Sequence, residues 1–261
     1  MNSIEIMDSI NVIKVGGGIL EDETSTAALL DRFAALPGKK VLVHGGGRSA
    51  TRIAAQLGVE SRMVEGRRIT DEPMLRIVTM VYAGLVNKTA VAALQARGVN
   101  ALGLCGADMD IIRGHKRPVK DIDYGWVGDI DRVDASMLQK FIDEHVVPVV
   151  APLCHDGKGH MLNTNADTIA REVASALAGS YKVTLTFCFE KPGVLARPDD
   201  DNSVIPHINK PLFTQLKAEG IISGGMIPKI DNAFDALDAG VEKVIITRAD
   251  NLDGSHGTLI D

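Results

Sequence analysis

Short apolar segments alternate with longer amphipathic segments along nearly the whole chain. Uninterrupted apolar runs predict buried strands at residues 10–15, 40–44, 99–105, 146–151, 181–187 and 243–247. Helical spacing of apolar positions predicts helices at residues 24–36, 49–57, 73–97, 134–144, 165–178, 211–219 and 232–239. Strands without polar alternation are typical of a mainly parallel sheet with both faces covered. The pattern therefore predicts an α/β fold, a three-layer αβα sandwich with a mainly parallel central sheet.

The segment at residues 111–133 follows neither pattern. Turn-forming residues interrupt it at Gly114, Pro118, Gly125 and Gly128. This punctuation predicts small β-hairpins rather than a helix. A new strand begins after Gly179, and we place a lobe boundary there, giving an N-terminal lobe at residues 1–178 and a C-terminal lobe at residues 179–261.

The helix predicted at residues 73–97 is long and apolar on more than one face. Thr70 or Asp71 can cap its start, Pro73 suits its first turn, and Gly98 suits its end. A helix that is apolar around much of its circumference is buried against more than its own sheet. Core burial and a subunit interface both satisfy this pattern, and we expect a homodimer through this helix.

Composition narrows the class of protein. The 261 residues carry a net charge of -6, which disfavours nucleic acid as a partner. The three cysteines show no metal-ligand spacing, which favours reduced core thiols. The N-terminus has acidic residues and no long apolar run. We therefore expect a cytoplasmic protein with no membrane partner.

Glycine runs and lysines mark the candidate chemistry. Gly16–Gly18 and Gly45–Gly47 each follow a predicted strand and precede a helix, which is where anions bind in open α/β sheets. Neither run matches a dinucleotide fingerprint or a Walker loop, and two tight turns remain the alternative. Lys14 lies within an apolar strand, and Lys229 follows the turn Gly224-Gly-Met-Ile-Pro228. An exposed edge strand and a surface position are the alternatives for these two lysines.

Two further motifs could take part in a charged site, one by orienting lysines and the other by binding a carboxylate. Asn163-Thr-Asn-Ala-Asp167 enters a predicted helix, so its members can cap the helix, and Asp167 could orient two lysines. Gly66-Arg-Arg-Ile-Thr70 offers two guanidinium groups suited to bidentate carboxylate capture. Surface charge is the alternative for one member of the arginine pair.

Taken in order, these motifs resemble the amino-acid kinase family, in its acylglutamate branch. The matching segments are Lys14-Val-Gly-Gly-Gly18, His44-Gly-Gly-Gly47, Gly66-Arg-Arg-Ile-Thr70, Asn87-Lys88, Asn163-Thr-Asn-Ala-Asp167 and Gly224-Gly-Met-Ile-Pro-Lys229. The resemblance implies the amino-acid kinase fold and ATP-dependent phosphorylation of the side-chain carboxylate of an N-acyl-L-glutamate. The step forms N-acetyl-L-glutamate 5-phosphate in arginine biosynthesis, with Mg²⁺ on the phosphates of ATP.

The resemblance also implies a role for each motif residue. The catalytic residues would be Lys14, Lys229 and Asp167, and the backbone N–H groups of Gly17, Gly45 and Gly46 would take up developing charge. The acylglutamate would contact Gly45, Gly46, Gly47, Arg68 and Asn163. The nucleotide would contact Lys14, Gly16, Gly17, Thr186, Gly225, Met226 and Lys229. No residue is expected to ligate a metal.

The chain departs from the family pattern at three places. Arg48 stands where the family usually has proline, so we hypothesise that it receives a second substrate carboxylate, as in a succinyl group; a solvent-facing Arg48 is the alternative. The strand end at Thr186 lacks the usual following acid and runs into a longer turn. No helix precedes the first strand and the segment after Ile246 is short, so we expect a dimer without arginine feedback.

Other functions compete with this interpretation. N-succinyl-L-glutamate could be the true substrate, or the chain could be a non-catalytic ligand-binding relative of these kinases. A carrier-linked aminoadipate is a third alternative, but it would favour a basic surface that the acidic composition does not provide.

Overall fold

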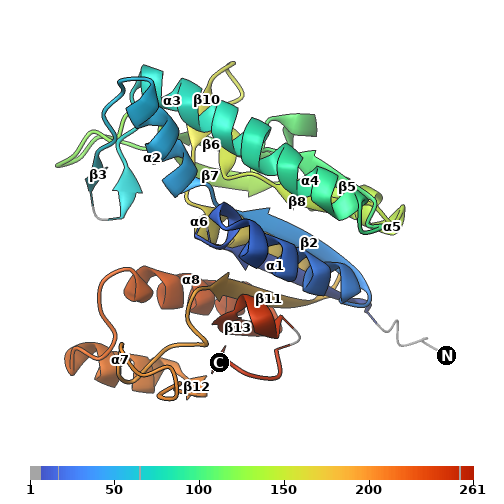
Figure 1. Ribbon diagram of the computed structural model, residues 1–261, viewed down its shortest axis with the longest axis vertical. Helices are drawn as coiled ribbons and strands as arrows, with labels where there is room; N and C mark the ends of the chain where they lie inside the picture. Colours follow the sequence, from blue (N-terminus) through green and yellow to red (C-terminus); the bar gives the residue numbers. More distant parts are fainter. Residues whose placement is uncertain (1–6, 17, 65, 253) are drawn as a thin grey trace.

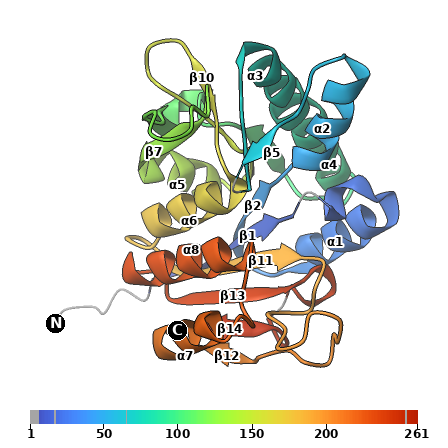
Figure 2. The same ribbon diagram turned by 90° about the vertical axis from the view of Figure 1, so that its left-hand side faces the viewer.

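An eight-stranded sheet forms the centre of the molecule (Figures 1 and 2). The computed structural model describes residues 7–16, 18–64, 66–252 and 254–261. In sheet order the strands are β12 (His207–Ile208), β14 (Thr258–Ile260), β13 (Lys243–Arg248), β11 (Lys182–Phe189), β1 (Ser9–Val15), β2 (Lys39–His44), β8 (Val147–Val150) and β5 (Ala101–Leu104). Neighbouring strands run parallel except β13 and β14. The predicted mainly parallel α/β sheet is confirmed.

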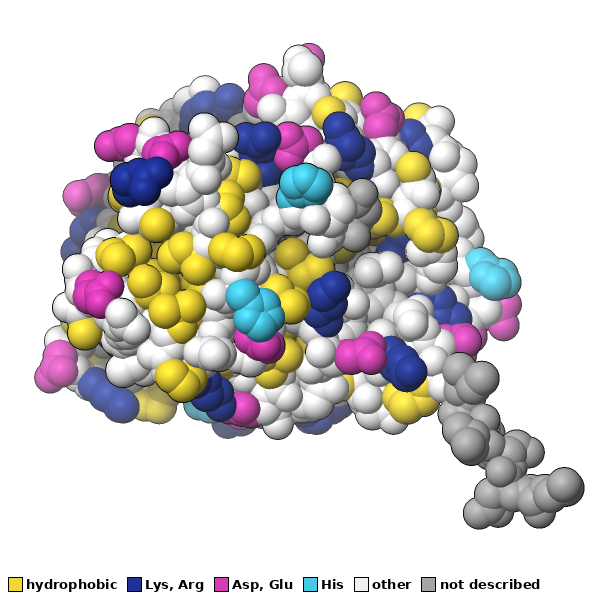
Figure 3. All heavy atoms as spheres, turned by 90° about the horizontal axis from the view of Figure 1, so that it is seen from below, with side chains coloured by type: hydrophobic (Ala, Val, Ile, Leu, Met, Phe, Trp, Pro, Cys, Tyr) yellow, Lys and Arg dark blue, Asp and Glu magenta, His cyan; other side chains and the backbone are white. Residues whose placement is uncertain are grey.

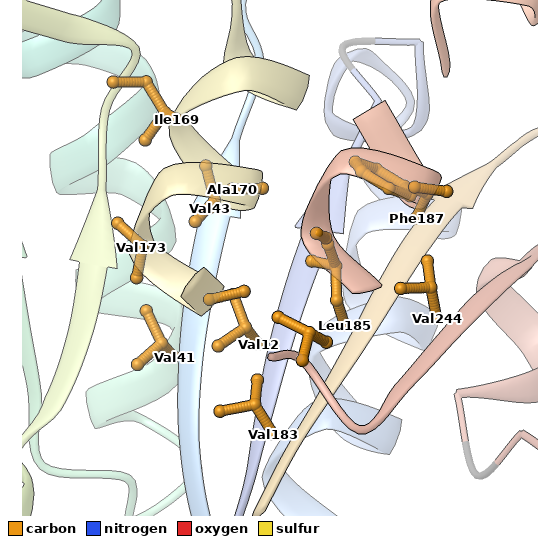
Figure 4. Packing of buried hydrophobic residues seen from close by; sticks show 14 of the residues in the cluster. Val12, Val41, Val43, Ile169, Ala170, Val173, Val183, Leu185, Phe187 and Val244 are labelled. Atoms are coloured by element: carbon orange, nitrogen blue, oxygen red, sulfur yellow. The ribbon is translucent and has the colours of Figure 1, made fainter. Parts of the chain in front are cut away.

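Helices cover both faces of this sheet. Successive residues of a strand point to opposite faces, so an uninterrupted apolar strand presents apolar side chains to a helix layer on each side. Val12 of β1 packs in a cluster with residues of α5 (Ala135–Asp143), α6 (Ala166–Leu177), α7 (Lys210–Ala218) and α8 (Met226–Asp238). Figure 4 shows Val12, Val41 and Val43 beneath α6. Ile13 and Val15 pack in a second cluster with α1 (Glu23–Ala35) and α4 (Asn87–Gln95). These layers form the predicted αβα sandwich.

A smaller sheet carries the hairpins. Its order is β10 (Met161–Asn163), β9 (Leu153–His155), β6 (Ile112–Lys116) and β7 (Gly128–Val133). The antiparallel β6–β7 pair confirms the hairpin predicted at residues 111–133. A separate hairpin joins β3 (Met63–Val64) to β4 (Arg67–Arg68). Sequence periodicity missed β9, β10, β12 and β14, because strands of two or three residues are too short to show a period.

The long helix predicted at residues 73–97 is present. It comprises α3 (Glu72–Thr79), the π-helical turn η2 (Met80–Val86) and α4. The Asp71 side chain caps it by accepting a hydrogen bond from the Met74 N–H at 2.9 Å. Met80 and Leu85 are more than half exposed. By length and composition alone the helix could cross a membrane, a test that core helices of globular proteins also pass.

Helix α8 begins earlier than the sequence pattern predicts. It starts at Met226 rather than at residue 232, directly after a turn in which Gly224 has a φ of +54°. Pro228 does not prevent this, because the first turn of a helix tolerates proline. Met226, Ile227 and Pro228, predicted to belong to a turn before Lys229, therefore form the start of the helix that carries Lys229.

The boundary expected near Gly179 falls between α6 and β11. The central sheet crosses it without a break, because β11 pairs with β1 along the whole length of β1. Both lobes consequently share one sheet.

A buried lysine closes the C-terminal end of α1. Lys40 on β2 is 8% exposed. Its ammonium donates hydrogen bonds to the carbonyl oxygens of Phe33, Ala34 and Leu36 at 2.7–2.9 Å. The last carbonyls of a helix have no partner within the helix, so this cation satisfies them. Burial lowers the pKa of Lys40.

Replacing Lys40 with methionine is expected to lower the free energy of unfolding by about 2–4 kcal/mol, because three carbonyls lose a charged donor. Urea unfolding of Lys40→Met measures this loss. Lys182→Met is the matched control, since Lys182 is an exposed lysine on β11. Equal midpoints for the two variants would contradict the capping role.

Candidate active site

Two lysines from opposite ends of the chain meet at one carboxylate. The Lys14 ammonium lies 2.6 Å from Asp167 Oδ1, and the Lys229 ammonium lies 3.0 Å from Asp167 Oδ2. All three side chains are less than one-fifth exposed. The predicted proximity of Lys14, Asp167 and Lys229 is confirmed.

Three central elements position this cluster. Lys14 lies on β1, which pairs with β2 on one side and β11 on the other, so the edge-strand alternative is wrong. Asn165 caps α6 by accepting hydrogen bonds from the N–H groups of Asp167 and Thr168 at 2.7 and 3.4 Å. The cap falls on Asn165, which leaves the Asp167 carboxylate to contact the lysines. Lys229 lies in the first turn of α8.

Burial and charge set the protonation of the cluster. Burial alone would raise the pKa of Asp167, but Lys14 and Lys229 outweigh it and lower this pKa well below its ordinary range. Burial lowers the pKa of Lys229, and Asp167 partly opposes that shift. The rings of Phe187 and Phe189 lie 5.4 and 5.8 Å from the Lys229 ammonium. Aromatic faces stabilise a cation at this range.

The first N–H group of each glycine run already has a backbone partner. The Gly16 N–H donates to the Cys188 carbonyl at 2.9 Å, and the Gly45 N–H donates to the Val15 carbonyl at 3.1 Å. These two N–H groups extend the sheet, so the oxyanion role predicted for Gly45 has a competing partner. Gly17, also predicted to contribute an N–H, lies outside the described residues. Gly46 remains as the N-cap of α2 (Gly47–Gln56).

A neutral histidine fixes the peptide next to Gly46. His44 is fully buried, and its Nδ1 lies 2.7 Å from the Gly45 carbonyl oxygen. Asn87 donates to His44 Nε2 at 3.0 Å, which assigns the proton to Nδ1. Burial lowers the pKa of His44 to about 4, with Lys88 also acting to lower it. Neutral His44 can therefore donate to Gly45 while accepting from Asn87.

A cavity of 160 Å³ opens beside the glycine run of α2. It is lined by the predicted residues Gly45, Gly46, Gly47, Arg68 and Asn163, together with Met63, Gly66, Arg67, Tyr82, Val127, Pro152, Thr164, Asn165 and Ala166. The structure therefore brings together five of the six residues predicted to bind the acylglutamate. We call this space the acceptor cavity.

Hydrogen bonds hold the polar walls of the acceptor cavity. Arg68 donates to the Gly47 carbonyl at 2.8 Å and to Thr51 Oγ1 at 2.9 Å, and it also donates to Ser61. The Asn163 amide donates to Thr70 Oγ1 at 2.9 Å. Arg68 and Asn163 are each 7% exposed, so both side chains are held before a ligand arrives.

Tyr82 is a cavity residue that sequence reasoning missed. It comes from the π-helical turn η2, and a β-carbon on Gly46 would lie 2.7 Å from its ring. Only glycine fits there, so Tyr82 fixes how closely the loop approaches the long helix. A single polar aromatic in an apolar helix was the available signal, but the spacing alone did not direct it to Gly46.

Arg48 lies elsewhere than predicted. Arg48 does not line the acceptor cavity; its Nη2 pairs with Glu190 Oε1 at 3.0 Å. It lines a second cavity of 300 Å³, which we call the phosphoryl cavity, with Gly16, Gly18, Ile19, Gly47, Phe189, Glu190 and Lys229. The attraction of the Glu190 carboxylate explains this placement.

The predicted nucleotide residues do not all share one cavity. Gly16 and Lys229 line the phosphoryl cavity. Met226 lines a third cavity of 200 Å³ with Phe189, Lys191, Gly193, Val194, Leu195, Pro198, Ile221, Ile222 and Ser223. Gly225 immediately precedes Met226 as the N-cap of α8. Thr186 is buried within β11 between β1 and β13, and it lines none of these three cavities.

The chain is similar in sequence and in fold to known proteins. The model of the amino acid kinase family matches residues 9–248. An acetylglutamate kinase from Bacteroides thetaiotaomicron is 62% identical over 97% of this chain and 98% of its own length. An acetylglutamate kinase from Cytophaga hutchinsonii is 51% identical over 94% of both chains. The crystal structure of smu.665 from Streptococcus mutans superposes with a TM-score of 0.81 at 28% identity, covering 96% of this chain and 98% of the other.

Replacing Asp167 with asparagine is expected to lower kcat by about 100-fold, because two buried lysines lose the charge that holds them. The variant also removes the charge that raises the pKa of Lys229, so its activity is expected to decline at a less alkaline pH. Rates measured from pH 6 to pH 10 test both effects.

Asp231→Asn is the matched control, because Asp231 is an exposed carboxylate on α8. Acid unfolding supplies a second measurement. The pKa of Asp167 is lowered by folding from its ordinary 3.8, so its stabilising effect is present above that value and is lost as the pH falls below it. An unchanged alkaline limb in Asp167→Asn would contradict the assigned coupling.

Proposed function

The chain belongs to the amino acid kinase family, and we propose that it transfers the γ-phosphoryl group of ATP to the side-chain carboxylate of N-acetyl-L-glutamate. The observation that carries this proposal is the Lys14–Asp167–Lys229 cluster, whose Lys229 lines the phosphoryl cavity. Relatives named acetylglutamate kinase, at 51–62% identity over nearly the full chain, support the acceptor. The product would be an acyl phosphate in arginine biosynthesis.

The reaction needs charge neutralisation more than acid–base chemistry. A carboxylate oxygen attacks the γ-phosphorus, the bond from this phosphorus to the bridging oxygen breaks, and ADP leaves with the electron pair. The carboxylate is already ionised at neutral pH, so no base is required. Two anions must approach each other, and catalysis depends on positioning and on cations that stabilise the transition state.

The lysine cluster is suited to this task. Lys14 and Lys229 contribute two positive charges and Asp167 one negative charge, which leaves one positive charge in a largely buried site. Buried charges interact more strongly than solvated ones. Asp167 acts as a positioning residue, because it contacts both ammonium groups. Gly46 and the first N–H groups of α2 would add hydrogen bonds to the transferring oxygens.

The acceptor cavity would hold N-acetyl-L-glutamate. Arg68 offers a planar guanidinium to the α-carboxylate, and Asn163 offers an amide to the other polar groups of the acid. Both side chains are prepositioned by hydrogen bonds to Gly47 and Thr70. Because these side chains are already held, fewer protein groups must be ordered when a small acid binds.

The nucleotide would occupy the C-terminal lobe, residues 179–261. The apolar residues Val194, Leu195, Ile221, Ile222 and Met226 suit the faces of an adenine ring. Mg²⁺ would be carried by the phosphates and would neutralise part of their charge. Among the residues that the structure describes, no group of three or more His, Cys, Asp or Glu side chains could hold a metal.

We also propose a cytoplasmic homodimer through the long helix α3–η2–α4. Met80 is 56% and Leu85 is 53% exposed on its η2 turn. Two large apolar side chains exposed within one short helical segment favour contact with an apolar partner surface.

A substrate panel tests the reaction. ADP release is expected with N-acetyl-L-glutamate, and free glutamate is expected to react at least about tenfold less efficiently because it lacks the acyl contacts. N-succinyl-L-glutamate belongs in the panel, since preference for it would move the assignment to a larger acyl group. ADP release with none of the three acids would contradict the proposed function.

Sedimentation velocity tests the dimer. The unaltered chain is expected to sediment as a dimer, and Met80→Asp/Leu85→Asp as a monomer, because charged groups are unfavourable at the centre of an apolar interface. Leu57→Asp is the matched control, since Leu57 is 59% exposed on another helix end. A monomeric or hexameric unaltered chain would show the assignment to be wrong.

A further inference from the structure

An exposed ion pair lies across the glycine loop of the phosphoryl cavity. Arg48 comes from the first turn of α2 and Glu190 from the residue after β11, and their side chains are 64% and 57% exposed. A β-carbon on Gly18 would lie 1.9 Å from Glu190 Oε1 and 2.6 Å from Arg48 Nη1. Both charged groups therefore rest directly over Gly18.

The two cations that line the phosphoryl cavity differ in burial and in the carboxylate that each one pairs with. Its lining residues include the cations Lys229 and Arg48 and one carboxylate, Glu190. Lys229 is largely buried and shares Asp167 with Lys14. Arg48 is largely exposed and pairs with Glu190. The charge of Arg48 is thus balanced by Glu190, which also lines the phosphoryl cavity, where we place the phosphates.

An ion pair of this kind is readily exchanged. Exposed ion pairs contribute little to stability, because water solvates the separated charges well. A phosphate offers a guanidinium two or more oxygens with greater charge than a carboxylate, and the contact is often bidentate. In the structure the Glu190 carboxylate lies over Gly18, where a phosphate oxygen would approach the loop backbone.

We propose that Arg48 is a phosphate-binding residue and that Glu190 occupies its guanidinium until the nucleotide arrives. This inference rests on the proposed function, because it assigns Arg48 to the nucleotide of that reaction rather than to the acyl group. Nucleotide binding exchanges the Arg48–Glu190 pair for an Arg48–phosphate contact. Arg48 adds a third cation beside Lys14 and Lys229.

The two partners of the pair are expected to have opposite effects on nucleotide affinity. Arg48→Ala should weaken binding of the magnesium complex of AMP-PNP, a non-hydrolysable ATP analogue, by about tenfold, the loss of one charged contact. Glu190→Gln should bind it as tightly as the unaltered chain or more tightly, because the competing carboxylate is gone. The double variant should bind more weakly than Glu190→Gln alone. Isothermal titration calorimetry measures all four affinities.

Controls separate this role from a structural one. Arg52→Ala removes an exposed arginine from the same helix and should leave the affinity unchanged. Arg48→Lys should recover part of the lost affinity, and melting curves show whether each variant is folded. If the pair only holds the two lobes together, Arg48→Ala and Glu190→Gln will weaken binding equally, and the proposal falls. It falls also if Arg48→Ala binds as tightly as the unaltered chain.

The binding experiment is independent of the acceptor. A chain that binds AMP-PNP but releases no ADP with any acylglutamate refutes the proposed reaction, while the comparison of Arg48 and Glu190 variants still decides the inference. A chain that does not bind AMP-PNP overturns the inference directly. In steady-state assays with N-acetyl-L-glutamate, Arg48→Ala should raise KM for ATP and leave KM for the acid unchanged.

Discussion

The Asp167 carboxylate is the constraint on which the site depends. It contacts two ammonium groups that are mostly withdrawn from water, where a charge is costly unless it is paired with an opposite charge. The three charges come from β1, α6 and α8, which belong to separate parts of the chain. The fold must therefore be complete before the cluster can form, and the cluster in turn links the start of two helices to the central strand.

The glycine run beside the cluster depends on a second buried polar set. His44 and Asn87 lie behind it, joining β2 to the long helix, and they fix the Gly45 peptide. A side chain on Gly103 would occupy this space, since its β-carbon would lie 1.9 Å from Asn87 Oδ1. The glycine run is thus held by the hydrogen bonds of His44 and Asn87. Gly46 and Gly103 leave the room that Tyr82 and Asn87 occupy.

Sequence patterns predicted the sheet and most helices, because six of the eight central strands are buried segments of four or more residues that appear as uninterrupted apolar runs. Strands β12 and β14 were not predicted, because two or three residues are too few to form a recognisable apolar run. The predicted start of α8 was wrong, because Gly224 and Gly225 precede the helix and Pro228 lies in its first turn, and all three residues are typical of turns. These misses concern short elements whose structure is decided by tertiary contacts rather than by local sequence.

Motif resemblance predicted that Lys14, Asp167 and Lys229 lie close together and that Arg68 and Asn163 share a cavity, but it could not orient Arg48. The direction of that side chain depends on Glu190, which lies far away in the sequence and belongs to no motif. A similar limit applies to Tyr82, which packs against Gly46, and to Phe187, whose ring faces the Lys229 ammonium. Residues that carry a motif can be found from the sequence, whereas their partners across the site require the fold.

The lysine cluster keeps its excess positive charge because the Cys188 thiol beside it is neutral. Burial raises the pKa of the Cys188 thiol to about 12, so no thiolate forms beside Lys14 and Lys229 at neutral pH. Phe187 and Phe189 contribute ring faces without a counter-charge. Had Cys188 been a thiolate, its charge and that of Asp167 would have offset both lysines; with a neutral thiol, one positive charge remains for the transferring phosphoryl group.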